Sequence, residues 1–161
     1  MKKLFISLCL LIVAISASAQ FERGKVFVNT SLTGLDLSYN KSSKGHFGVE
    51  AMGGYFLLDN IALTGNICMD LGDAVDAYSF GVRGRYYFEN NGIYIGAMLK
   101  DTSYSFKEAS NDNDFAIVGE AGYAFFLSRT VTIEPAIYYS QSFTDNDYTQ
   151  FGLKVGFSFY F

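Results

Sequence analysis

Seven ionisable side chains share one phase of a period-two pattern that runs along most of the sequence. They are Glu50, Arg83, Arg85, Lys100, Glu120, Glu134 and Lys154. Paired carboxylates can serve as general acid and base, and charged side chains that line a pore can select ions. Buried charges of opposite sign instead pair with one another, because an unpaired ion in a low-dielectric interior is costly. Since both signs interleave here, we expect a salt-bridged network rather than a catalytic pair or an ion path.

His46 is the only histidine, and it follows Ser42 and Ser43 closely in the sequence. A histidine can activate a serine when both lie within hydrogen-bond reach of each other and of an orienting group. The residues two positions on either side of His46, on the same strand face, are Lys44 and Gly48, which are neither nucleophiles nor acids. We therefore expect a solvated histidine and assign no catalytic residue.

Two acidic stretches could in principle supply oxygen ligands to a divalent cation. Asn111–Asp114 and Asp145–Asp147 combine aspartate with asparagine, but neither has the spacing of a known calcium loop. Such residues are common in solvated turns. No zinc pattern or glycine-rich phosphate loop is present, so we expect neither a metal site nor a cofactor.

The elements that position the seven ionisable side chains are predicted to be β-strands. Tyrosine and phenylalanine are abundant, glycine occurs 16 times and proline once, and this composition favours strands over helices. In the first strand, Leu35 and Leu37 break the apolar phase, which predicts a β-bulge near Gly34. The alternation predicts eight strands at about residues 25–40, 46–58, 61–71, 76–88, 92–102, 113–127, 130–143 and 147–161.

The connections between these strands alternate in length. Short turns fall at 59–60, 89–91 and 128–129, and longer polar segments such as NKSSKG and SYSFKEASNDND fall between them. This order is typical of an up-and-down antiparallel barrel, in which short turns gather at one end and long loops at the other.

Two architectures bury one face of such a sheet. In a soluble lipocalin-like barrel the apolar face points inward, whereas in a membrane barrel it meets lipid and the polar face lines the lumen. The polar face here carries few charges and much glycine, which suits a narrow interior better than a water-exposed surface. The apolar face also carries an aromatic band near each end, as expected at two lipid–water interfaces. These features predict an all-β, eight-stranded antiparallel transmembrane β-barrel.

The first 19 residues have the features of a cleaved signal peptide. Two lysines precede an apolar run, which ends in the small-residue triplet Ala17-Ser18-Ala19. We expect cleavage after Ala19 and a barrel domain over residues 20–161. Loss of Lys2 and Lys3 leaves 10 basic against 16 acidic residues, a net charge near −6, which argues against a nucleic-acid partner.

The chain ends in FGLKVGFSFYF, a regular strand with large apolar residues at alternate positions. Its terminal Phe161, with Phe159, resembles the C-terminal aromatic signal that the barrel-assembly machinery recognises in bacterial outer-membrane proteins. Across residues 20–161 the chain resembles the small eight-stranded barrels of the OmpX and OmpA-transmembrane-domain type, and its leader resembles those of exported Bacteroidota proteins. The resemblance implies a bacterial outer-membrane location, with membrane lipid and the assembly machinery as partners.

The sequence therefore predicts a monomeric outer-membrane barrel whose lumen is plugged by side chains. Its function would be structural, or would be binding of an extracellular ligand through the long loops, and we expect no enzymatic activity. Two alternatives remain open. Some barrels of this size are enzymes that modify lipid A with a rim histidine, a role that would fall to His46, and a soluble periplasmic lipocalin-like carrier would have the inverse arrangement of faces.

Overall fold

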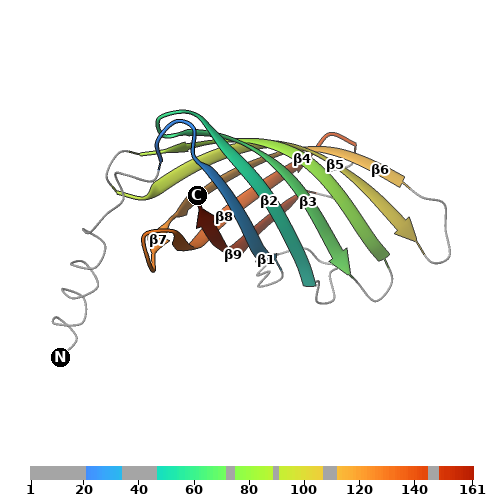
Figure 1. The fold of residues 1–161 in the computed structure, drawn as a ribbon. Coiled ribbons are helices and arrows are strands. Elements are labelled where there is room, and N and C mark those ends of the chain that lie inside the picture. The colour runs from blue at the N-terminus through green and yellow to red at the C-terminus, as the bar shows by residue number, and fades with distance from the viewer. Residues whose placement is uncertain (1–20, 34–46, 72–74, 89–90, 107–111, 145–148) are drawn as a thin grey trace.

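Nine β-strands, hydrogen-bonded edge to edge, form the computed structural model of this chain (Figure 1). The structure describes residues 21–33, 47–71, 75–88, 91–106, 112–144 and 149–161. The strands are β1 Val26–Thr33, β2 Phe47–Leu58, β3 Ile61–Leu71, β4 Val75–Tyr87, β5 Ile93–Phe106, β6 Asp112–Tyr123, β7 Phe125–Phe126, β8 Val131–Ser142 and β9 Gln150–Tyr160. In the described part of the chain, no helix has the length and apolar character needed to cross a membrane.

The sheet closes on itself to form a barrel. Each strand pairs antiparallel with its neighbour, and β1 pairs with β9. One edge of β8 is shared, because β6 pairs with residues 136–142 and β7 with residues 132–133. Because β7 is a two-residue continuation of β6 along the same edge of β8, the barrel wall has eight strands. The predicted eight-stranded antiparallel barrel is confirmed, and its first strand pairs with its last.

The single predicted strand over 113–127 is wrong in one respect, because it is interrupted at Ala124. The register on either side of the interruption is the same, since Gly122 lies opposite Ala136 and Phe125 lies opposite Ile133. In this register Pro135 lies opposite Tyr123, in the gap between the pairing of β6 with β8 and the pairing of β7 with β8. Proline has no N–H to donate to a neighbouring strand, so the ladder cannot be complete at this point. On the opposite edge the pairing with β5 continues, because the amide of Ala124 donates to the carbonyl oxygen of Gly92 at 2.8 Å.

The expected bulge near Gly34 lies outside the described residues, which instead show a register shift between Phe56 and Leu58 at the end of β2. The pairing also defines the stagger of the barrel. One circuit of the wall, taken from each residue to its partner on the next strand, starts at Tyr160 on β9 and returns to β9 at Gln150, ten residues away. The partners along the way are Phe27, Gly54, Thr64, Arg83, Met98, Val118 and Ser140. A stagger of this size accompanies a strand tilt of roughly 40°.

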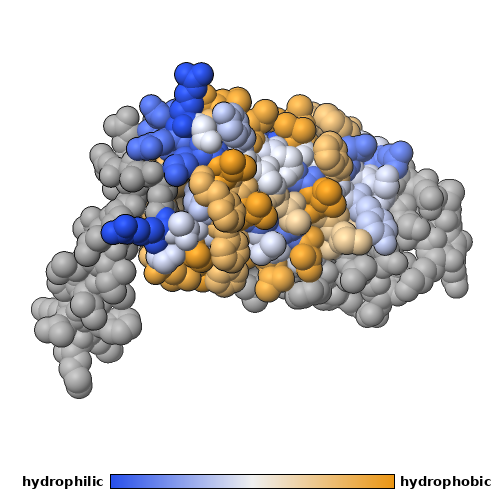
Figure 2. All heavy atoms as spheres, in the orientation of Figure 1, coloured by the Kyte–Doolittle hydropathy of each residue, from blue (hydrophilic) through white to orange (hydrophobic). Residues whose placement is uncertain are grey.

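The two faces of the wall are apolar outside and polar inside. Ile67 and Phe80 are each 61% exposed, whereas Arg83 is 2% and Glu134 is 1% exposed. This orientation is the reverse of a lipocalin-like barrel, and the soluble-carrier alternative therefore does not fit the fold. Figure 2 shows apolar residues gathered over the middle of the barrel, with hydrophilic residues toward its ends.

Aromatic side chains lie on the outer surface near both ends of the barrel. Near the short turns the exposed members are Tyr55, Tyr86, Phe88, Phe125, Phe159 and Phe161. Near the long connections they are Tyr78, Phe80, Phe115, Tyr139, Phe143 and Phe151. Tyrosine and phenylalanine at these depths suit the two lipid–water interfaces that border an apolar belt.

Candidate functional site

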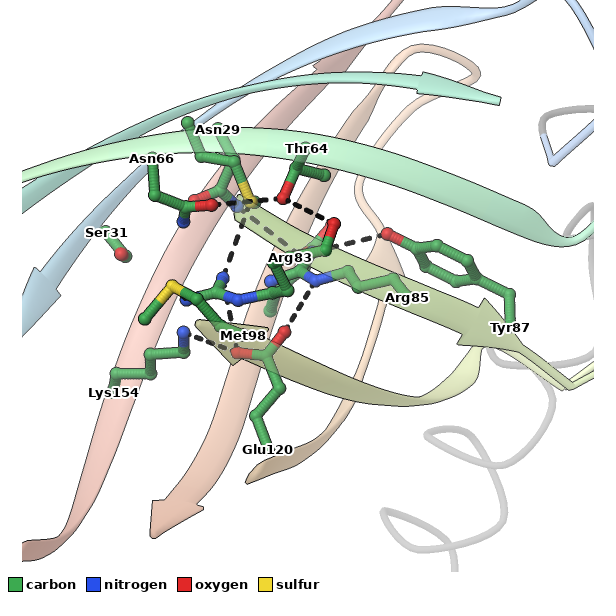
Figure 3. Close-up of polar contacts among 12 residues, drawn as sticks. Asn29, Ser31, Thr64, Asn66, Arg83, Arg85, Tyr87, Met98, Glu120 and Lys154 are labelled. Carbon is green, nitrogen blue, oxygen red and sulfur yellow. Dashed lines mark hydrogen bonds and ion pairs between the residues drawn. The ribbon is translucent and has the colours of Figure 1, made fainter. Parts of the chain in front are cut away.

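Six charged side chains project into the barrel from five strands. Arg83 and Arg85 are two residues apart on β4 and therefore point to the same face of the sheet. The acids come from three other strands, Glu50 from β2, Glu120 from β6 and Glu134 from β8, and Lys154 comes from β9. We call this set of six residues the charge layer. Figure 3 shows Arg83, Arg85, Glu120 and Lys154 converging between the strands.

Glu120 lies at the centre of the charge layer and contacts all three cations. Its Oε1 accepts from Arg85 Nε at 2.6 Å, and its Oε2 lies 2.6 Å from Lys154 Nζ and 3.3 Å from Arg83 Nη1. Its side chain is 1% exposed. Because Glu120 holds one carboxylate among three positive charges, its removal would leave more positive than negative charge in the lumen.

The remaining acids complete the pairing on either side of Glu120. Arg83 Nη2 donates to Glu50 Oε1 at 2.8 Å, and Lys154 Nζ lies 3.4 Å from Glu50 Oε2. Arg85 Nη1 donates to Glu134 Oε2 at 2.9 Å. Three acids and three bases therefore balance, and each ion contacts at least one ion of opposite sign.

Neutral polar groups donate hydrogen bonds to two of the three buried acids, Glu50 and Glu134. Thr132, Ser158 and Tyr160 donate to Glu134 Oε1 at 2.8, 2.6 and 2.9 Å. Ser31 donates to Glu50 at 3.2 Å, and the amide of Asn66 also donates to Glu50. Buried ion pairs compensate their desolvation only when such additional hydrogen bonds are present. Glu50 and Glu134 meet this condition within the charge layer.

The comparisons with known proteins identify the fold. No protein-family model matches the sequence, and no curated protein matches it. The N-terminal β-barrel domain of Pseudomonas aeruginosa OprF matches with a TM-score of 0.67 and 13% identity, over 86% of this chain and 98% of that one. Neisserial surface protein A matches with a TM-score of 0.62 and 14% identity, over 84% of this chain and 95% of that one. The Yersinia pestis outer membrane protein Ail gives 0.59 and 12%, over 86% and 100%.

The chain has the fold of the small outer-membrane β-barrels. At these identities the likeness concerns the fold alone. The resemblance inferred from the C-terminal strand and the alternation is therefore confirmed at the level of architecture.

Lys100 is the one member of the predicted set that this barrel does not bring into the charge layer. It is half-buried on β5, between Leu99 and Asp101, and it makes no ion pair with any described residue. Its register partners are Gly81 and Ala116, which lie closer to the long-connection end than Arg83 and Glu120. Alternation gave the correct phase for Lys100 but not its height in the barrel.

The structure shows a second inward-facing group that the sequence analysis does not predict. It lies beside the charge layer, at the short-turn end of the barrel. It consists of Phe27, Phe56, Tyr87, Tyr94 and Tyr160, all almost completely buried, and we call it the aromatic layer. The two layers touch, because the Arg85 guanidinium lies 4.4 Å from the centre of the Tyr94 ring. The signal that could have found them is the alternation itself, since all five fall in the polar phase of their strands.

The two residues proposed as an assembly signal lie on the outside of the barrel. Phe159 is 45% and Phe161 is 69% exposed. Phe161 also extends the pairing of β9 with the start of β1, because its amide donates to Val26 O at 2.8 Å and its carbonyl accepts from Val26 N at 3.3 Å. The side chain of Phe161 is thus presented to the surroundings while its backbone is held.

His46, Ser42 and Ser43 lie outside the described residues, as do Asn111 and Asp145–Asp147. Within the parts of the chain that the structure describes, no cluster of three or more histidine, cysteine, aspartate or glutamate side chains is placed to hold a metal ion.

Proposed function

We propose that this chain is a monomeric barrel of a bacterial outer membrane with a closed lumen. Its role is structural, with contacts to extracellular ligands made through its long connections. An outer-membrane location is supported by the apolar outer belt and by the bacterial outer-membrane origin of proteins that share the fold. The charge layer has the chemistry of a plug rather than of a reaction centre, and we assign no enzymatic activity.

The main support for a closed lumen is that every ion of the charge layer contacts an ion of opposite charge. Charges from five strands meet across the interior, with Arg83–Glu50 on one side and Arg85–Glu134 on the other joined through Glu120. An eight-stranded barrel has an interior just wide enough for its side chains. The side chains of all six ions are 7% exposed or less, so water has little access to them.

Planar-bilayer recordings test the plug directly. We expect the purified barrel to show little steady conductance, because an ion crossing the lumen would have to break several buried pairs at once. Glu120→Gln, which removes one negative charge and keeps the side-chain shape, should conduct more often than the native barrel. A stable ohmic pore in the native protein would contradict the plug.

Location is tested by fractionation of cells that express the chain. We expect the protein to resist carbonate extraction from membranes, because its outer surface is apolar around the whole wall. Its band on SDS gels should also shift on heating, since a closed barrel resists unfolding by detergent at room temperature. Recovery from the soluble periplasmic fraction would rule out the membrane location.

A surface-binding role rests on the arrangement of the connections. The strand ends that border residues 34–46, 72–74, 107–111 and 143–149 lie at one end of the barrel, whereas the connections at 59–60, 88–92 and 127–130 and both described chain ends lie at the other. Yersinia pestis Ail, which shares the fold, has been crystallised with the heparin analogue sucrose octasulfate. We propose that the corresponding segments of this chain, residues 34–46, 72–74, 107–111 and 145–148, provide its ligand contacts.

A further inference from the structure

Phe21 is buried in the barrel although it precedes the first strand. It is 3% exposed, and its ring stacks on Tyr87 with 4.2 Å between centroids and 20° between planes. It also contacts the rings of Phe126, Phe56 and Tyr160, with centroids 5.6, 5.9 and 5.9 Å away. These four rings come from β7, β2, β9 and β4, and together they form a socket around a single aromatic side chain.

A short backbone segment holds Phe21 in this socket. The amide of Asn60, in the β2–β3 turn, donates to Phe21 O at 2.7 Å. The amide of Arg23 donates to the carboxylate of Asp59 at 2.9 Å. Two further bonds join the segment to the end of β2, from Gly24 N to Phe56 O and from Phe56 N to Lys25 O, each 2.9 Å long. Residues 21–25 therefore cross the short-turn end of the barrel as a strap.

The strap turns sharply between Glu22 and Lys25. Lys25 N donates to Glu22 O at 3.2 Å, and Gly24 has φ = +90°. This is the geometry of a type II turn, in which the third position has positive φ and favours glycine. A Cβ at Gly24 would meet no other atom within 4 Å, so a larger residue there would be disfavoured by backbone conformation alone.

The strap is separable from the barrel wall. Every other ring of the socket belongs to a strand of the closed ladder, whereas Phe21 belongs to none. Withdrawal of Phe21 would break only the few bonds of the strap and would leave the pairing of all strands intact. The socket would then be an apolar cavity of one ring, a type of cavity that stays dry and accepts benzene-sized molecules.

We propose that residues 21–25 act as a stopper for the short-turn end of the barrel, and that the site they occupy is a socket selective for one planar aromatic ring. Phe21 is its resident ligand, supplied by the chain itself. When Phe21 is absent, the socket binds a free aromatic molecule of the same size. The inference is independent of the closed lumen, because three of the four socket rings belong to the aromatic layer and none belongs to the charge layer.

Benzene is the probe for this site. In the Phe21→Ala barrel, we expect a lower urea midpoint of unfolding than in the native protein, and benzene should raise that midpoint again, because a ligand that binds only the folded state stabilises it. Phe125→Ala is the matched control, since Phe125 is a lipid-facing phenylalanine next to the socket residue Phe126. Benzene should change neither the native nor the Phe125→Ala midpoint. An equal effect on all three proteins, or none on Phe21→Ala, would overturn the proposal.

A pair of glycine variants provides a second test that leaves every ring in place. Gly24 and Gly53 both have open space where an alanine Cβ would lie, but only Gly24 has positive φ. Gly24→Ala should release the strap and make the socket responsive to benzene, whereas Gly53→Ala should behave as the native protein does. N-terminal sequencing of each variant controls for altered processing. If Gly24→Ala and Gly53→Ala respond identically to benzene, the strap does not hold the stopper.

Discussion

Replacement of Glu120 by leucine should destabilise the barrel by about 3–5 kcal/mol, the range observed when one partner of a buried ion pair is removed. The substitution removes the carboxylate that contacts Arg85 and Lys154 at 2.6 Å and Arg83 at 3.3 Å. Of the charge layer, two acids, Glu50 and Glu134, would remain with three buried cations. Urea unfolding of barrels refolded in detergent, followed by circular dichroism, would measure the loss.

Two further variants at this position and one control elsewhere separate the effect of charge from that of packing. Glu120→Gln retains the shape and most hydrogen-bonding capacity, so its loss of stability would report the charge alone. Glu120→Lys should be the most damaging, since it adds a fourth cation. Asp101→Leu removes an exposed carboxylate from β5 and serves as the control, for which no loss is expected. If Glu120→Leu unfolds within about 1 kcal/mol of the native barrel, the charge layer does not stabilise the fold.

Deletion of Phe161 should reduce the amount of assembled barrel in cells far more than it reduces the stability of barrels already formed. The Phe161 side chain is 69% exposed, so it gains much less than the roughly 1.5–3 kcal/mol of a fully buried phenylalanine. Recognition by the assembly machinery, in contrast, would depend on this terminal ring. The membrane-inserted yield in cells and the urea midpoint of protein refolded in detergent would measure the two effects separately.

Two matched variants sharpen the experiment. Phe161→Ala keeps the backbone bonds to Val26 and removes only the ring. Phe143→Ala removes a ring of similar exposure, 65%, that is not terminal. We expect a strong loss of yield for Phe161→Ala and little change for Phe143→Ala. Equal losses of yield and stability for Phe161→Ala would mean that the ring acts only by packing.

The sequence predicted the architecture well because alternation is a local signal. In β4, the inward residues Arg83, Arg85 and Tyr87 alternate with the outward residues Val82 and Tyr86, and this pattern requires no knowledge of the neighbouring strands. The closure of the wall followed from the same pattern, since an unpaired strand edge is not tolerated in lipid.

Features that depend on relations between strands were harder to predict. Lys100 shares a face with the charge layer, but its height relative to Glu120 depends on the register of β5 with β6. The break at Ala124 depends on Pro135, which is eleven residues away in sequence but belongs to the facing strand. The socket for Phe21 depends on four strands that alternation alone cannot bring together.

The ten-residue stagger of the wall has a consequence for how the barrel can change its sequence. Because the stagger is an even number of residues, one circuit of the wall returns to a residue whose side chain points to the same face as the starting residue. Inward-facing residues are therefore paired with inward-facing residues around the whole circumference. A one-residue insertion in any strand would make the stagger odd and would place a lipid-facing row against a lumen-facing row somewhere on the circumference. Changes of strand length are therefore compatible with closure only in steps of two, or where a bulge absorbs the extra residue. The interruption at Ala124 obeys this rule, because the register on both of its sides is unchanged.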